Sequence, residues 1–190
     1  GLSAGTYCAT ISDNFGCKDT ICHTLVAPKP LVGELDIPAE PLCNGGETCI
    51  SVKSLTGGTG NKYTFQINGG IRYPIDTCIT VYAGEYLVRM IDSTGCSITK
   101  SLTIGQPNPI EVNLGPDQEI QLGLPSPVIN ALITSPSSID TLIWSPIDNL
   151  VCLASDCSSV EVSPVETTTY TLTAVDINGC KGIDEIVVKV

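Results

Sequence analysis

The chain has 190 residues, of which 18 are glycine and 13 are proline, and it carries a net charge of −11 with only nine lysines and arginines. Such a shortage of cations excludes a surface that binds nucleic-acid phosphates or anionic membranes, because both depend on clustered positive charge. No apolar run approaches the roughly 20 residues of a membrane-spanning helix, and apolar residues do not recur at helical spacing. We therefore predict an all-β protein without a nucleic-acid partner and without membrane insertion.

Ten cysteines are spread through the chain. Disulfides form and persist in oxidising compartments, so this cysteine content predicts an extracellular protein. The first residues, GLSAGTYCAT, have neither the basic start nor the apolar core of a signal peptide, which indicates a mature internal fragment.

One sequence motif occurs three times in chain order: YCATISDNFGC from residue 7 to 17, YLVRMIDSTGC from 86 to 96 and YTLTAVDINGC from 170 to 180. Each copy has a Tyr, five residues, an Asp, two residues and Gly-Cys. We interpret each copy as a β-hairpin in which the Asp bonds the turn backbone and the Gly takes the left-handed position of a three-residue loop. Alternation predicts three core-facing series, namely Tyr7, Ala9 and Ile11, then Tyr86, Val88 and Met90, then Tyr170, Leu172 and Ala174.

The segment after the first two copies is also repeated, since Pro28 to Leu31 matches Pro107 to Ile110. The two Pro-X-Pro segments are predicted to be extended linkers. They divide the chain into the last part of one module (1–31), a complete module (32–110) and a divergent third (111–190). Within the complete module, residues 62–67 alternate as a strand before the Asn68-Gly69-Gly70 turn, and residues 57–60 form another turn. Seven or so short strands in roughly 80 residues predict an immunoglobulin-like sandwich of two sheets.

The cysteines are expected to be staples. In the first hairpin, Cys8 falls opposite Cys22 in a non-hydrogen-bonded pair, where two cysteines approach closely enough to bond. The complete module contains Cys43, Cys49, Cys78 and Cys96, which allow three connectivities. We favour Cys43 with Cys96 and Cys49 with Cys78, because Cys96 ends a core-facing series and should reach the opposite sheet.

In the third module we expect Cys152 to bond Cys157, since five residues of loop can close locally. Cys17 and Cys180 are then unpaired or paired outside the module, and Cys17 would pair with an equivalent of Cys43 that precedes this chain. Zinc is not expected, because the cysteines form no pair of CxxC knuckles and His23 has no partner at ligand spacing.

Nothing in the sequence predicts catalysis: there is one histidine, and the carboxylates are scattered over turns. We therefore expect no enzyme and no cofactor. Structural calcium is the one ion that the acidic residues near the module junctions would suit, and these are Glu34, Asp36, Glu111 and Asp117. For the three repeated aspartates, Asp13, Asp92 and Asp176, turn capping is the first interpretation.

The complete module resembles the SprB-type repeat of very large surface adhesins from gliding Bacteroidota. The resemblance rests on residues 43–46 (CNGG), 57–63 (GGTGNKY), 83–86 (AGEY) and 92–96 (DSTGC), and residues 1–30 are similar to the last part of the same repeat. The third module resembles PKD-like domains through residues 113–117, 144–146 and 163–170. The resemblance implies surface display by type IX secretion and a role in adhesion, gliding or filament building. Four cysteines, Cys8, Cys22, Cys49 and Cys78, exceed the usual set of such repeats.

Two functions follow as hypotheses. The favoured one is a structural stalk or filament segment of a surface adhesin, whose partners are neighbouring modules of the same long chain and identical chains in a fibre. The alternative is an adhesin module whose sandwich-end loops bind a glycan or a surface, with Tyr73 and Tyr82 as the exposed aromatic candidates. Trp144 is expected to be a core tryptophan instead.

Overall fold

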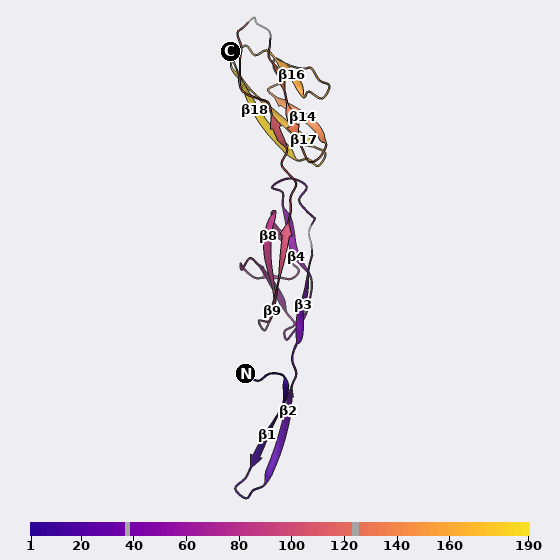
Figure 1. Ribbon diagram of the computed structural model, residues 1–190, viewed down its shortest axis with the longest axis vertical. Helices are drawn as coiled ribbons and strands as arrows, with labels where there is room; N and C mark the ends of the chain where they lie inside the picture. The colour runs from indigo at the N-terminus through magenta and orange to yellow at the C-terminus, as the bar shows by residue number, and fades with distance from the viewer. Residues whose placement is uncertain (37–38, 123–125) are drawn as a thin grey trace. The chain divides into compact units, whose positions relative to one another are not determined.

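The computed structural model describes residues 1–36, 39–122 and 126–190 (Figure 1). Every regular element in these ranges is a β-strand. Among the same residues there is no helix long and apolar enough to cross a membrane. The chain divides into two compact units. Unit 1 comprises Gly1–Ile37, Cys49–Ile79 and Glu85–Thr103, and unit 2 comprises Pro38–Thr48, Thr80–Gly84 and Ile104–Val190.

Unit 1 begins with a two-stranded hairpin of β1 (Gly5–Ser12) and β2 (Lys18–Leu25). Threonine hydroxyls bond across it, and Cys8 lies directly opposite Cys22. The predicted burial of one hairpin face is wrong for Ala9 and Ile11, which are exposed, while Tyr7 is half-buried. The reason is that β1 and β2 form a sheet of their own, to which the described residues add no third strand.

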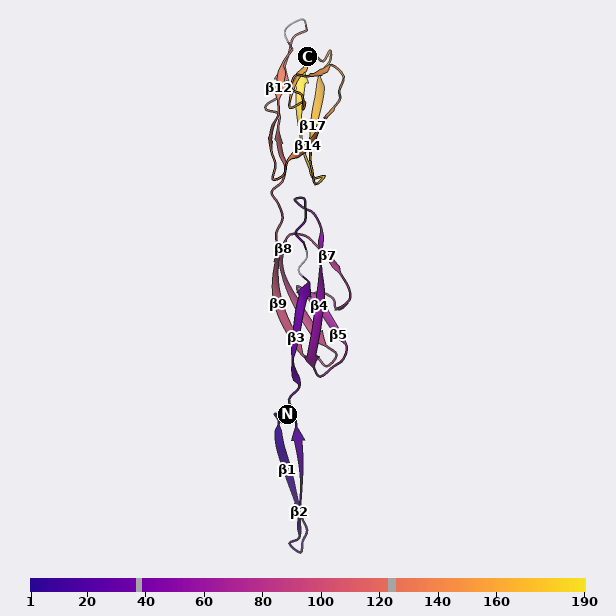
Figure 2. The same cartoon turned by 90° about the vertical axis from the view of Figure 1, so that its right-hand side faces the viewer.

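Two further sheets are built from β3 to β9, and most of these strands are labelled in Figure 2. The first has the order β3-β4-β7, and the second has the order β6-β5-β8-β9. Their strands are β3 (Lys29–Asp36), β4 (Thr48–Gly58), β5 (Tyr63–Ile67), β6 (Tyr73–Pro74), β7 (Ile79–Val81), β8 (Gly84–Asp92) and β9 (Ser97–Ile104). Val88 and Met90 are fully buried, as the alternation of the second motif predicts, and Phe65 is buried with them.

Unit 2 contains a four-stranded sheet of order β11-β18-β17-β14, a three-stranded sheet of order β12-β16-β15 and the pair β10-β13. The strands are β10 (Glu111–Asn113), β11 (Gln118–Glu119), β12 (Val128–Asn130), β13 (Leu132–Thr134), β14 (Ile139–Ser145), β15 (Leu150–Cys152), β16 (Ser159–Val162), β17 (Thr168–Asp176) and β18 (Lys181–Lys189). The sheets enclose one apolar core around Trp144, Tyr170 and Leu172. Trp144 is only 6% exposed and its indole N–H donates to the Cys157 carbonyl at 3.0 Å, which confirms the predicted core tryptophan.

Candidate functional site

The three copies of the repeated motif fold into the same turn. In each copy the Asp N–H donates to the Cys carbonyl, and the Gly N–H donates back to the Asp carbonyl, at 2.9–3.2 Å. One carboxylate oxygen of the Asp also accepts the N–H of the Cys, at 3.0 Å in Asp13, 2.8 Å in Asp92 and 2.9 Å in Asp176. The glycines have φ of 89°, 98° and 81°, the left-handed conformation that the motif predicts. Each turn therefore presents its cysteine in the same local geometry.

The cysteines at the ends of these turns differ in their bonding. Cys180 is 8% exposed and is joined to Cys43 by a disulfide, whereas Cys17 and Cys96 are exposed free thiols. The expected pairing of Cys43 with Cys96 is therefore wrong. Cys180 bonds a cysteine outside residues 111–190, which is one of the two outcomes expected for it.

The strand register explains this correction. Cys43 belongs to the connection between the end of β3 and the start of β4, where Asp36 pairs with Ser51. Cys96 follows the Asp92 turn, and the Asp92 carboxylate binds the Thr59 and Gly60 N–H groups beyond the other end of β4. The 11 residues of β4 span roughly 35 Å at about 3.3 Å per residue, far more than a disulfide can bridge.

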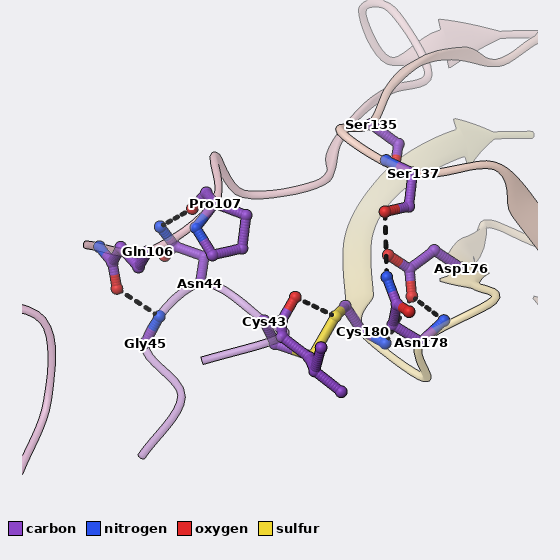
Figure 3. Close-up of a disulfide and its surroundings, with 11 residues drawn as sticks. Cys43, Asn44, Gly45, Gln106, Pro107, Ser135, Ser137, Asp176, Asn178 and Cys180 are labelled. Atoms are coloured by element: carbon purple, nitrogen blue, oxygen red, sulfur yellow. Dashed lines mark hydrogen bonds between the residues drawn. A yellow bond between two sulfur atoms is a disulfide. The ribbon is translucent and has the colours of Figure 1, made fainter. Parts of the chain in front are cut away.

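The Cys43–Cys180 bond is the centre of a small joint within unit 2, drawn in Figure 3. The two Cα atoms are 5.3 Å apart. On one side, the Cys180 Sγ lies 3.3 Å from the Leu42 carbonyl oxygen, a packing contact because a disulfide sulfur has no proton to donate. On the other side, Cys180 packs with Ile110 and Ala174 in a small apolar cluster. The disulfide thus lies between a loop and a hairpin, with Cys180 buried and Cys43 half-buried.

Hydrogen bonds fasten the loop of the joint to the second Pro-X-Pro linker. The Asn44 side-chain amide donates to the Pro107 carbonyl at 3.0 Å, and the Gly45 N–H donates to the Gln106 side-chain oxygen at 2.8 Å (Figure 3). A third bond within the loop, from the Gly46 N–H to the Cys43 carbonyl at 3.0 Å, closes the turn that carries the cysteine. The loop is therefore held by polar contacts that reach from residue 44 to residue 107.

The other three disulfides join the cysteines that the sequence analysis paired. They are Cys8–Cys22, Cys49–Cys78 and Cys152–Cys157, with Cα separations of 4.0, 5.5 and 4.8 Å. Each closes a short stretch of chain, 14, 29 and 5 positions, compared with 137 for Cys43–Cys180.

Asp92 is the most strongly held carboxylate of the three turns. It is 3% exposed and accepts hydrogen bonds from its own turn and from the Thr59 and Gly60 N–H groups, at 3.0 and 3.2 Å. Burial acts to raise the pKa of Asp92, but the hydrogen bonds from Thr59, Thr94 and Gly60 outweigh it and hold the pKa well below its ordinary value. Asp176 is 2% exposed, and one of its carboxylate oxygens has no hydrogen-bond partner among the described residues. Each of the three aspartates caps its own turn through one carboxylate oxygen.

The remaining candidate residues are not brought together into a chemical site. Across residues 1–36, 39–122 and 126–190, no three His, Cys, Asp or Glu side chains form a group that could hold a metal ion. The four acidic residues suggested for calcium lie within these ranges, so they form no such group either. His23 is exposed on β2. Tyr73 is half-buried and packs against Phe65 with ring centroids 5.8 Å apart, so it is not the exposed platform that we expected. Tyr82 is exposed, and its hydroxyl donates to Glu47 at 2.6 Å, an interaction that raises the pKa of Tyr82.

Comparison with known proteins gives the fold. No protein-family model and no curated protein matches the chain. The N-terminal eight Ig domains of Down Syndrome Cell Adhesion Molecule (DSCAM) are similar with a TM-score of 0.51 at 13% identity, over 98% of this chain and 26% of that one. A C-terminal fragment of intimin, solved with the intimin-binding domain of its receptor Tir, has a TM-score of 0.40 at 14% identity, over 82% and 62% of the two chains. The fibronectin(III)-like modules of Clostridium thermocellum CbhA have a TM-score of 0.34 at 16% identity, over 84% and 93%. The DSCAM likeness, together with the sheets described above, shows that this chain is all-β and has the fold of tandem immunoglobulin-like domains.

Proposed function

We propose that this chain is a structural stalk segment of a large bacterial surface adhesin, and that the Cys43–Cys180 disulfide makes it resistant to tension. The bond encloses 137 positions, so strands β4 to β17 lie inside the covalent loop and only β1, β2, β3 and β18 lie outside it. Tension applied at the two ends of the chain passes through the sulfur–sulfur bond. The enclosed strands cannot be extended while that bond is intact.

The cellular location and the partners in this proposal are inferred from the disulfides and from the resemblance to surface adhesins. Four disulfides suit an oxidising compartment, and the SprB-type and PKD-like motifs imply type IX secretion to the cell surface of a gliding bacterium. The likeness to domains of a cell adhesion molecule agrees with an adhesive protein that is not an enzyme. Neighbouring modules of the same chain and identical chains in a fibre are the proposed partners, with module boundaries near residues 31 and 110.

Single-molecule pulling on the oxidised 190-residue chain tests the mechanical role. In the C43S/C180S variant, the loop opens while Cys49–Cys78 and Cys152–Cys157 stay closed. Subtracting their 29 and 5 positions from 137 leaves 103 positions, which corresponds to roughly 340–370 Å of additional contour length. The control is C152S/C157S, which removes a disulfide inside the loop and should add no length. Equal contour lengths for the C43S/C180S variant and the parent chain would contradict the proposal.

A ligand-binding module remains the second candidate because of Tyr82. This tyrosine is 53% exposed in the Thr80–Gly84 segment of unit 2, and its hydroxyl bonds a carboxylate, a pairing of aromatic face and acid that suits sugar hydroxyls. Glycan-array binding that is lost in Tyr82→Ala and kept in Tyr73→Ala would favour this function over a purely structural one.

A further inference from the structure

Two exposed thiols, Cys17 and Cys96, occupy the position that Cys180 holds in the third copy of the repeated motif. We propose that Cys96, and by the same argument Cys17, is the hairpin half of a second disulfide joint. Its partner is a cysteine in a Leu-Cys-Asn-Gly loop, of the kind that residues 42–45 supply to Cys180, from another repeat. This inference rests on the proposed function only in assuming that such repeats lie in series.

The hairpin that carries Cys96 has the geometry of the hairpin that is already bonded. Asp92 and Asp176 accept the N–H of the following cysteine at 2.8 and 2.9 Å, and the cysteine carbonyls accept the Asp N–H at 2.9 and 3.0 Å. Gly95 and Gly179 have φ of 98° and 81°. The structure therefore fixes the backbone of Cys96 as it fixes that of Cys180, and the difference lies in what covers the sulfur atom.

The Pro-X-Pro linker reaches both hairpins at the end that carries the cysteine. In unit 2, Ile110 packs with Cys180, and a Cβ added to Gly182 would lie 2.5 Å from the Ile110 carbonyl oxygen. In unit 1 the matching Pro-X-Pro segment runs into strand β3, and a Cβ added to Gly57 would lie 2.0 Å from the Pro30 carbonyl oxygen. A Cβ added to the neighbouring Gly58 would lie 2.4 Å from the Asp92 carboxylate and 3.4 Å from the Leu31 side chain. The segment from Pro28 to Leu31 therefore passes beside the Asp92 turn. Two of the three parts of the joint, hairpin and linker, are thus present at Cys96.

The missing third part is the cysteine loop, and the linker beside Cys96 retains one of its two attachment points. Asn44 binds the Pro107 carbonyl, and Pro28 stands in the matching place of the first linker. Gln106, which binds Gly45, is replaced in the first linker by Ala27. At Cys96 we therefore expect the asparagine of the incoming loop to bond the Pro28 carbonyl. The bond that corresponds to Gly45–Gln106 should not form, because Ala27 has no side-chain acceptor.

The bond requires a disulfide donor, and oxidised glutathione or a thiol–disulfide oxidoreductase belongs to the right chemical class. The Cys96 thiolate attacks one sulfur of the donor disulfide, one donor thiol leaves, and a mixed disulfide forms. The loop cysteine thiolate then attacks the Cys96 sulfur and releases the second donor thiol. Two thiols lose two electrons and two protons in total, and the donor disulfide takes up both.

The first test is non-reducing peptide mapping of the native full-length protein. A Cys96 peptide bonded to a Leu-Cys-Asn-Gly type of peptide supports the inference. If the bond lies within one polypeptide, electrophoretic mass is unchanged by reduction, and if it joins two polypeptides, a multimer is lost on reduction. A free Cys96, a Cys96–Cys17 bond or a glutathione adduct would overturn the inference. If the pulling results through Cys43–Cys180 hold in that case, the proposed stalk function stands without it.

The second test uses the 190-residue chain with a synthetic peptide of residues 41–46, acetylated, amidated and activated as its pyridyl disulfide. Exchange releases pyridinethione and needs no further oxidant. At equilibrium with glutathione, the peptide should be preferred at Cys96 about fivefold over the same peptide with Ala in place of Asn, the effect expected of one hydrogen bond. The matched control is an exposed thiol on the strand that follows Cys96, Ser101→Cys on β9 in a Cys96→Ser background, where both peptides should bind equally. Equal binding of the two peptides at Cys96 would contradict the role of the joint.

Discussion

Opening the Cys43–Cys180 bond should cost this chain more stability than opening any of its other disulfides. In the chain-entropy model, the stabilisation grows with the logarithm of the enclosed length. A separation of 137 positions gives roughly 5 kcal/mol at 25 °C, and the 5 positions of Cys152–Cys157 give roughly 2 kcal/mol. We therefore expect the C43S/C180S variant to lose about 3 kcal/mol more unfolding free energy than C152S/C157S.

Urea denaturation without reductant measures this difference. Trp144 is the only tryptophan and is buried in unit 2, so its emission should shift to longer wavelength on unfolding. Both variants replace sulfur by hydroxyl at two positions, which controls for the substitution itself. A loss in C43S/C180S equal to or smaller than that in C152S/C157S would refute the reasoning that the long loop constrains the unfolded chain.

Three further substitutions test the packing of single residues. Asp92→Asn places an amide NH2 against the Thr59 N–H. Since the pKa of Asp92 is lowered in the folded state, the stabilisation from its carboxylate is complete above about pH 4 and is lost progressively as the pH falls below that value. The urea midpoints of parent and variant should therefore converge between about pH 4 and pH 2. Gly57→Ala should destabilise unit 1 by more than Gly95→Ala, measured by urea midpoint, because both have positive φ but only the Gly57 Cβ would meet backbone. Trp144→Phe leaves the Cys157 carbonyl without its donor and should cost about 1–3 kcal/mol in the same assay, followed by circular dichroism.

Much of the local structure could be predicted from the sequence because it depends on neighbouring residues. The Asp-X-X-Gly-Cys turn needs a carboxylate within reach of its own backbone and a glycine at positive φ, and both requirements are visible in four or five letters. The core positions of β8 and β17 follow from alternation for the same reason. Tyr73 was beyond this kind of reasoning, since its burial depends on Phe65 from the adjacent strand β5.

The Cys43–Cys180 disulfide could not be predicted from spacing, because a partner for Cys43 was sought only among the cysteines of residues 32–110. Within such a set Cys43 and Cys96 are a sensible pair, and Cys180 is left over. What the sequence does not reveal is that Cys43 meets the cysteine of the Asp176 turn, and that Asn44 and Gly45 find their acceptors at residues 107 and 106. The one available signal was the repetition of the final cysteine in a third module that is otherwise divergent.

That repetition has a physical explanation in the turn itself. The Asp carboxylate and the glycine fix the cysteine backbone within five residues, and the turn keeps the same bonds on the exposed hairpin of β1 and β2 as on the buried strands of β17 and β18. The joint is formed by the turn, the linker and a short loop, so it does not depend on the core residues or the strand order of the two sheets. Residues 111–190 can therefore differ from residues 32–110 in core and strand order while keeping Cys180, and under the proposed function we expect the turn motif wherever one repeat is bonded to another.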